Sequence, residues 1–338
     1  MLSTTTVDNT TTGPDYLLEL GRGFWAAKAL LSAVELNIFP MLAKTPATEP
    51  QIRERLGLHP RATRDFLDAL VGLGLLERDG GTYRNTELTD TYLDPTKPTF
   101  FGGRLKMLSW QYSVWGNLAQ LLRTGEKQSG AGDFSQLYSR PEAVRGFMLA
   151  MDGANAGIGT AIAREIDWRD RSSFVDVGGA RGNLAAEIVK AQPHLNGGCY
   201  DLPPVEPFFD EHMENLGLKD KVHFHAGDFF TDNLPIADVY IFGHVLHDWD
   251  DEKRIALLRK AYDTLPSGGC AMAYDAMIDE DRRDPTNLLM SISMQLITPG
   301  GSEYTASDCE GWMRGAGFEK TSVHRLTESD QLVVGYKA

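Results

Sequence analysis

The segment that most constrains the fold of this chain runs from Phe174 to Asn183 and reads Phe-Val-Asp-Val-Gly-Gly-Ala-Arg-Gly-Asn. An apolar, β-branched run leads to an acid, glycines follow, and an apolar helical pattern begins at Leu184. The order strand, tight turn, helix is the opening unit of a nucleotide-binding α/β sheet. Its spacing is acid-x-Gly-x-(Gly/Ala)-x-Gly rather than the dinucleotide fingerprint. The candidate ligand-contacting residues are therefore Asp176, Gly178, Gly179 and Gly182.

The pattern that follows Trp168 predicts a doubly wound α/β domain over residues 169–338, because short apolar runs alternate with helical periodicity. The last two runs lie close together in the sequence, which is typical of a sheet that ends in an antiparallel hairpin. The expected strands cover residues 173–177, 198–200, 222–226, 239–242, 271–274, 320–323 and 332–336.

The first 100 residues show a different pattern of helix-capping and turn residues. Residues 1–14 are Thr-rich and lack the apolar core of a secretory signal, so we expect a disordered tail. Residues 16–42 form a long, strongly apolar helical pattern, part of which we interpret as a subunit interface. A capping box from Thr48 to Gln51, a helix starting near Pro60 and a hairpin around Gly80 complete a winged-helix pattern over residues 15–100.

A winged helix can bind DNA or serve as a dimerisation module. The formal net charge of −14 favours dimerisation, because phosphate binding needs clustered lysine and arginine. Residues 101–168 are predicted to be a mainly helical linker. Within it, Phe147 and Met151 share one helix face, which fits either core packing or the wall of an aromatic pocket.

The residues after each expected strand are the next candidates, since ligands of such sheets bind beyond the carboxyl ends of the strands. Asp201 and Leu202 follow the second strand, and an acid there can accept two ribose hydroxyls. Asp228 and Phe229 follow the third, where they can bind and stack on an adenine. Taken alone, Asp201 would suit NAD and other adenosine cofactors equally.

Four motifs then occur in order: Asp-Val-Gly-Gly, Asp-Leu-Pro, Gly-Asp-Phe-Phe and Leu-His-Asp-Trp-Asp-Asp-Glu. With these motifs the chain resembles the plant and bacterial class I small-molecule O-methyltransferases over essentially its whole length. The resemblance implies a Rossmann-like methyltransferase sheet preceded by a winged-helix-like dimerisation domain. It also implies S-adenosylmethionine as methyl donor, S-adenosylhomocysteine as product, a small aromatic or polycyclic metabolite as acceptor, and a homodimer.

The same resemblance implies the roles of individual residues. His247 corresponds to the general base, which fits the chemistry because a phenol of pKa about 10 is a poor nucleophile until its proton is removed. Glu303 and, with less weight, Asp275 correspond to the acids that orient it. Gly243 and Trp249 are further expected cofactor-binding residues, in addition to the residues named after the first three strands. The expected substrate-binding residues are Phe147, Met151, Asn155, Asn287, Met290, Ser291 and Met294.

Two positions depart from the family pattern. Ala180 takes the place of the middle glycine, so the turn must tolerate a Cβ. Gly243 stands where plant relatives carry a lysine. The pairs His244/His247 and His223/His225 suggest a metal, but no third ligand at metal-site spacing is visible, and we expect none.

Other functions remain open from sequence alone: methyl transfer to nitrogen or carbon, NAD(P)-dependent oxidoreduction, or a ligand-sensing DNA-binding regulator. Neither nucleic acid nor membrane is an expected partner, given the acidic charge and the lack of a long apolar run. The three cysteines are far apart in the sequence, which fits a reducing, cytoplasmic environment.

Overall fold

The structure is a computed structural model that describes residues 13–97, 99–130 and 138–338. The chain divides into two compact units, Met1–Tyr112 and Ser113–Ala338, and the division falls within helix α6 (Gly102–Trp115). The domain boundaries expected at residues 100 and 168 stay predictions. Of the expected N-terminal tail, only Gly13 and Pro14 lie within the described residues, and Pro14 already begins a helix.

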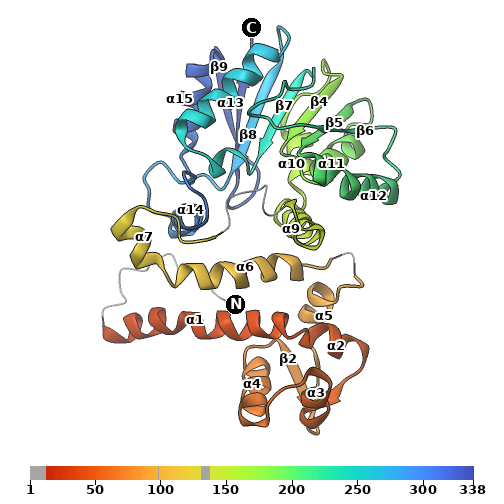
Figure 1. Ribbon diagram of the computed structural model, residues 1–338, viewed down its shortest axis with the longest axis vertical. Helices are drawn as coiled ribbons and strands as arrows, with labels where there is room; N and C mark the ends of the chain where they lie inside the picture. Colours follow the sequence, from red (N-terminus) through yellow and green to blue (C-terminus); the bar gives the residue numbers. More distant parts are fainter. Residues whose placement is uncertain (1–12, 98, 131–137) are drawn as a thin grey trace. The chain divides into compact units, whose positions relative to one another are not determined.

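The first unit combines helices with a small sheet of strand order β1-β3-β2 (Figure 1). The predicted capping box is present, because the backbone N–H of Thr48 donates to the Gln51 side chain over 2.9 Å. The predicted hairpin is also present, whereas β1 was not foreseen. The elements are α1 (Pro14–Glu35), α2 (Ile38–Lys44), β1 (Ala47–Thr48), α3 (Glu49–Leu56), α4 (Pro60–Gly72), β2 (Leu76–Asp79), β3 (Thr82–Asn85) and α5 (Glu87–Leu93).

The single helix predicted over residues 16–42 is wrong in one respect: it is two helices. Asn37 has φ 56°, a left-handed conformation that asparagine tolerates and that ends the α-helical ladder. Among the described helices none is by itself long and apolar enough to cross a membrane; α1 and α2 reach that length only as a pair bent by 57°.

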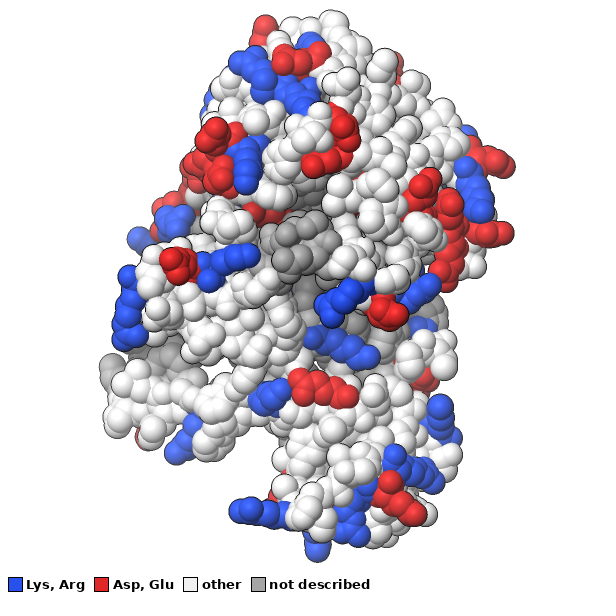
Figure 2. Space-filling view, in the orientation of Figure 1, with Lys and Arg blue, Asp and Glu red and all other residues white. Residues whose placement is uncertain are grey.

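Several basic side chains of the winged-helix region form ion pairs with acids. Arg78 bonds to Asp68, and Arg84 Nε lies 2.7 Å from Glu77. Figure 2 shows acidic and basic side chains interspersed on the face of the molecule in view.

The second unit is built around a seven-stranded sheet of order β6-β5-β4-β7-β8-β10-β9 (Figure 1). All neighbouring strands are parallel except β10, which runs antiparallel to both β8 and β9. All seven strands were predicted, to within two residues at each end. They are β4 (Ser173–Val177), β5 (Asn196–Asp201), β6 (Val222–Ala226), β7 (Val239–Gly243), β8 (Cys270–Asp275), β9 (Lys320–Arg325) and β10 (Gln331–Tyr336).

Helices cover both faces of this sheet and bury a core on each. On one face Tyr240 and Phe242 pack with α13 and α15, and on the other Phe174 and Ile241 pack with α10, α11 and α12. The helices of this unit are α7 (Leu118–Thr124), α9 (Pro141–Ala154), α10 (Ile158–Glu165), α11 (Asn183–Ala191), α12 (Glu206–Leu216), α13 (Asp251–Thr264), α14 (Pro285–Ile297) and α15 (Ala306–Ala316).

The helix predicted from Pro141 through Ile158 is also two helices, because Gly157 has φ 82° and separates α9 from α10. The chain leaves β4 toward β5 and β6 and then returns to β7 on the other side of β4. This reversal is the point at which ligands bind in open α/β sheets.

Candidate active site

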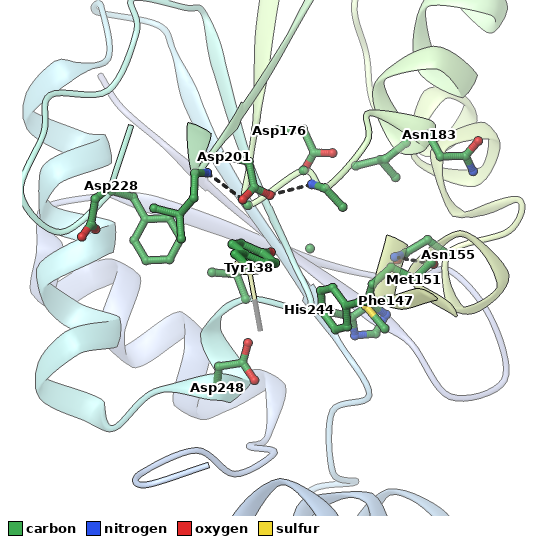
Figure 3. A pocket seen from close by; sticks show the side chains of 18 of the residues that line it. Tyr138, Phe147, Met151, Asn155, Asp176, Asn183, Asp201, Asp228, His244 and Asp248 are labelled. Atoms are coloured by element: carbon green, nitrogen blue, oxygen red, sulfur yellow. Dashed lines mark hydrogen bonds between the residues drawn. The ribbon is translucent and has the colours of Figure 1, made fainter. Parts of the chain in front are cut away.

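A cavity of about 440 Å³ lies at the carboxyl ends of β4, β5, β7 and β8. Figure 3 shows side chains from these strand ends and from α9 converging on it. Eleven of the predicted site residues line it: Phe147, Met151, Asn155, Asp176, Gly178, Gly179, Asp201, Leu202, Asp228, Phe229 and Gly243; Trp249 is a twelfth. Gly182 lies beyond the lining, at the start of α11, with φ 81°.

The glycine turn after β4 is left-handed at three positions. Gly178 has φ 76°, and a Cβ there would lie 2.7 Å from Val245 Cγ2. Ala180 has φ 51°, so the departure from glycine is accommodated at some backbone strain. The Ala180 N–H donates to Asp201 Oδ2 over 2.8 Å, which fixes the turn against β5.

The lining is strongly acidic. Among the described residues it contains five aspartates, Asp152, Asp176, Asp201, Asp228 and Asp248, and neither lysine nor arginine. Burial raises the pKa of Asp176 to about 8 and that of Asp201 to about 7. A cavity of this kind suits a cation and disfavours a phosphorylated cofactor. The cationic amino and sulfonium groups of S-adenosylmethionine fit these carboxylates. Its adenosine fits the residues at the strand ends, Asp201, Asp228 and Phe229.

The aromatic end of the cavity comes from the loop after β6 and the turn after β7. Phe230 and Trp249 meet edge to face with centroids 4.7 Å apart, and Phe229 lies 4.8 Å from Phe230. Lys260 of α13 donates to the carbonyl oxygens of Phe229, Phe230 and Asp232 at 2.6, 3.1 and 2.9 Å. Sequence reasoning missed Lys260, which holds the loop that carries Phe229.

The three predicted catalytic residues lie close together, and none of them is among the residues that line the cavity. His247 lies in a 3₁₀ turn (Leu246–Asp248), Asp275 ends β8, and Glu303 follows α14. His247 Nδ1 lies 2.7 Å from Glu303 Oε1 and 3.2 Å from Asp275 Oδ1. Its Nε2 is 3.9 Å from Asp248 Oδ1, beyond hydrogen-bonding distance. In the neutral form of His247 this geometry lets Nδ1–H donate to a carboxylate while Nε2 keeps a lone pair.

Burial and the neighbouring carboxylates have opposite effects on the pKa of His247. Burial alone lowers the pKa of the imidazole, but Glu303, Asp275 and Asp248 outweigh it and raise the pKa to about 10. Burial in turn raises the pKa of Glu303. The carboxylates around His247 therefore favour its imidazolium form.

A buried arginine joins the two turns that carry these residues. Arg254 of α13 is 2% exposed; its Nε donates to the Leu246 carbonyl over 2.9 Å, and its Nη2 donates to the Ser302 carbonyl. The Ser302 N–H donates to the His247 carbonyl over 2.9 Å. The adjacent Gly301 leaves no room for a side chain, since a Cβ would lie 2.3 Å from the same carbonyl oxygen. Arg254 carries no motif and was not predicted.

His244 lies beside this group and lines the cavity. One ligand-type atom from each of His244, His247 and Asp275 falls within 4.8 Å of the others, so β8 supplies the third side chain that the sequence pattern did not show. Nδ1 of His247 is engaged by Glu303 in this group. The expectation that the site holds no metal stays a prediction.

The side of the cavity next to α9 is aromatic and apolar, with Phe147, Met151 and Tyr138 (Figure 3). The Tyr274 hydroxyl donates to Asn155 Oδ1 over 2.8 Å and fixes its amide. Tyr274 also accounts for Gly243, because a Cβ at residue 243 would lie 2.2 Å from the Tyr274 ring. Tyr138 and Tyr274 were not predicted.

The α14 residues expected to bind substrate do not line this cavity. The Asn287 amide donates to the carbonyl oxygens of Met277 and Ser329 at 2.7 and 3.0 Å, which is a structural use. Ser291 accepts from the Glu303 N–H over 3.2 Å and supports that residue. Met294 is buried and Met290 half-buried on the same helix.

Comparison with known proteins places these features in a family. Residues 115–319 match the family model described as O-methyltransferase domain, and residues 18–95 match that of the O-methyltransferase dimerisation domain. The chain is 48% identical to the tetracenomycin polyketide synthesis 8-O-methyl transferase TcmO of Streptomyces glaucescens, with 96% of this chain and 97% of that protein covered.

Two further matches bear on the chemistry. The chain is 38% identical to the N,N-dimethyltransferase OxyT of Streptomyces rimosus, over 95% of this chain and 96% of the relative. The crystal structure of human N-acetylserotonin methyltransferase in complex with SAM superposes with a TM-score of 0.87 at 30% identity, covering 97% of this chain and 99% of the human chain.

Proposed function

The chain belongs to the S-adenosylmethionine-dependent O-methyltransferase family, and from this premise we propose that it methylates a hydroxyl of a small aromatic or polycyclic metabolite with His247 as general base. The observation that supports the base most directly is the 2.7 Å contact between His247 Nδ1 and Glu303 Oε1. The acceptor class is supported by the aromatic and apolar side chains of Tyr138, Phe147 and Met151 in the lining, together with the polyketide in the name of the relative TcmO.

When bound, S-adenosylmethionine supplies an electrophilic methyl group on a cationic sulfur. The chain's own residues do the rest. Nε2 of His247 takes the proton of the acceptor hydroxyl as its oxygen attacks the methyl carbon, while Glu303 holds Nδ1–H and stabilises the imidazolium that forms. The candidate residues that hold the cofactor are Asp176, Gly178, Gly179, Asp201, Asp228, Phe229 and Trp249.

Aromatic side chains and Met151 keep the acceptor ring in place and exclude water from the reacting oxygen. Holding the reacting atoms in line contributes as much as or more than the proton transfer, which typically contributes about 10²–10⁴-fold. Asn155, whose amide oxygen accepts from the Tyr274 hydroxyl, is a candidate for orienting either partner.

A second candidate is methyl transfer to an amine, which the 38% identity to an N,N-dimethyltransferase favours. The test offers the enzyme a polycyclic phenol and its amino analogue separately, with a ¹³C-labelled methyl donor. We expect a new methyl carbon resonance at an O–CH₃ shift from the phenol and a lower rate with the amine. Labelling of the amine alone would overturn the proposed function.

The association and compartment of the protein belong to the same proposal. The dimerisation-domain match and the exposed apolar side chains of α1, such as Leu17 and Leu20 at 68% and 67%, support a homodimer. The three cysteines are free and buried, which supports the cytoplasm. No role for nucleic acid or membrane is part of this proposal.

A further inference from the structure

His244 occupies an unusual place for a residue outside the predicted machinery. It follows β7 directly, has φ 51°, and its N–H donates to the Tyr274 carbonyl over 3.0 Å. A left-handed conformation is uncommon for a residue other than glycine, and such strain concentrates at functional positions. The imidazole forms part of the cavity wall (Figure 3).

Both ring nitrogens of His244 face carboxylates. Nδ1 lies 3.5 Å from Asp275 Oδ1, and Nε2 lies 3.4 Å from Asp330 Oδ1. Asp330 is itself anchored by the hydroxyls of Thr327 and Ser329, at 2.7 and 2.9 Å. His244 therefore connects the turn before β10 with the end of β8.

The same oxygen of Asp275 is shared between two imidazoles. Oδ1 lies 3.2 Å from His247 Nδ1 and 3.5 Å from His244 Nδ1, and it has no hydrogen bond from any residue that the structure describes. The other oxygen, Oδ2, accepts from the Tyr304 hydroxyl. Oδ1 is buried and lies close enough to interact with the imidazole of either histidine.

From this arrangement we propose that His244 is a positioning residue, which competes with His247 for Asp275 and thereby sets how strongly the base holds its proton. The inference rests on the proposed role of His247. With His244 present, Asp275 is divided between two imidazoles. Without His244, Asp275 turns wholly to His247, and the neutral, base-competent form of His247 appears at higher pH. Without Asp330, His244 turns to Asp275 and the effect is reversed.

The other ionisable groups around the two histidines are accounted for. Glu303 faces His247 Nδ1, Asp248 lies on its Nε2 side, and Tyr274 packs edge-on against His244 with centroids 5.1 Å apart. Tyr304 bonds to Asp275, and Arg254 stacks on Tyr304 at 4.9 Å. None of these groups changes in the variants below.

The test measures kcat against pH for the wild type, His244→Asn and Asp330→Asn with one phenolic acceptor. Asparagine is chosen at residue 244 because it tolerates the left-handed backbone. We expect the half-maximal pH to rise by about one unit in His244→Asn, with ~10-fold loss near neutral pH that recovers at alkaline pH. In Asp330→Asn we expect it to fall. His223→Asn, at an exposed position on β6, should leave the profile unchanged.

Three results would overturn the inference: an unmoved profile in both variants, an equal loss at every pH, or a loss of activity after dialysis against a chelator. The thermal unfolding midpoint and S-adenosylhomocysteine affinity of each variant show whether it is folded. If His244→Asn does not fold, the pH profile of Asp330→Asn still tests the inference. Failure of the proposed base is separate, because it would appear as full activity in a His247→Ala variant.

Discussion

His247 Nδ1 lies 2.7 Å from Glu303 Oε1 and 3.2 Å from Asp275 Oδ1, so one imidazole nitrogen faces two buried carboxylates that differ in distance. Glu303 is hydrogen-bonded to His247, whereas Oδ1 of Asp275 has no hydrogen bond from the residues that the structure describes. The two acids therefore have unequal shares in orienting the base, although both are buried.

The first prediction separates these acids. Glu303→Gln should lower the maximal kcat by ~10–100-fold, because it removes a charge-assisted hydrogen bond worth about 1.5–3 kcal/mol. Asp275→Asn should lower it by less. Glu303→Gln should also move the acid limb of the kcat–pH profile to lower pH, since Glu303 helps to raise the pKa of His247 to about 10. Steady-state kinetics over a pH series measure both effects. A larger loss in Asp275→Asn would contradict the assigned order.

The second prediction concerns protons released on cofactor binding. Asp201 and Asp176 have pKa values raised to about 7 and about 8, so at pH 7 the free protein holds protons on them. A ligand that donates hydrogen bonds to these carboxyl groups favours their carboxylate form, and binding of S-adenosylhomocysteine should release protons at pH 7 and few above pH 9. Calorimetric titrations in phosphate and Tris give the number released. Asp201→Asn should lower it; proton uptake at pH 7 would refute this account.

The third prediction concerns the ion pair between Asp152 of α9 and Arg181 of the glycine turn, joined through Arg181 Nε and Asp152 Oδ2 at 2.6 Å. It links the acceptor wall to the cofactor turn. A double-mutant cycle with Asp152→Asn and Arg181→Gln should give a coupling of ~1–2 kcal/mol in S-adenosylhomocysteine affinity. The matched control is Arg145–Glu211, an exposed pair that also starts from α9 and should show no coupling. Strict additivity at Asp152–Arg181 would show that the pair does not support binding.

The fourth prediction tests the homodimer. Leu20 and Trp25 on α1 are 67% and 60% exposed in the single chain. Replacing both with glutamate should convert a dimer to a monomer in sedimentation velocity at micromolar concentration, because charges would be buried in an apolar contact. Ile236→Glu, at a residue that is 89% exposed in the catalytic unit, should leave the dimer intact. A wild-type monomer would rule out the interface.

Much of the fold followed from local pattern. The strands and the ends that carry Asp176, Asp201 and Asp228 were predictable, because a parallel sheet places the carboxyl ends of its strands together. The two helix breaks were not, because the left-handed conformations of Asn37 and Gly157 leave the apolar periodicity intact.

The supporting residues of the site were beyond sequence reasoning for a different reason. Arg254 and Lys260 act on backbone carbonyls, which carry no sequence signal. Asn287 and Ser291 were assigned to substrate by resemblance, yet they support loops and Glu303, since a helix face does not reveal which side meets the cavity. His244 gained its partners only through the tertiary placement of Asp330.

The most direct test of the central claim is the rate of methyl transfer to a phenolic acceptor by His247→Ala at pH 7, where a phenol of pKa about 10 stays protonated. If His247 removes the proton, kcat falls by about 10²–10⁴-fold, S-adenosylhomocysteine affinity is unchanged, and part of the loss is recovered above the pKa of the acceptor. A variant that keeps near-wild-type kcat at pH 7 would contradict the role of His247 as general base.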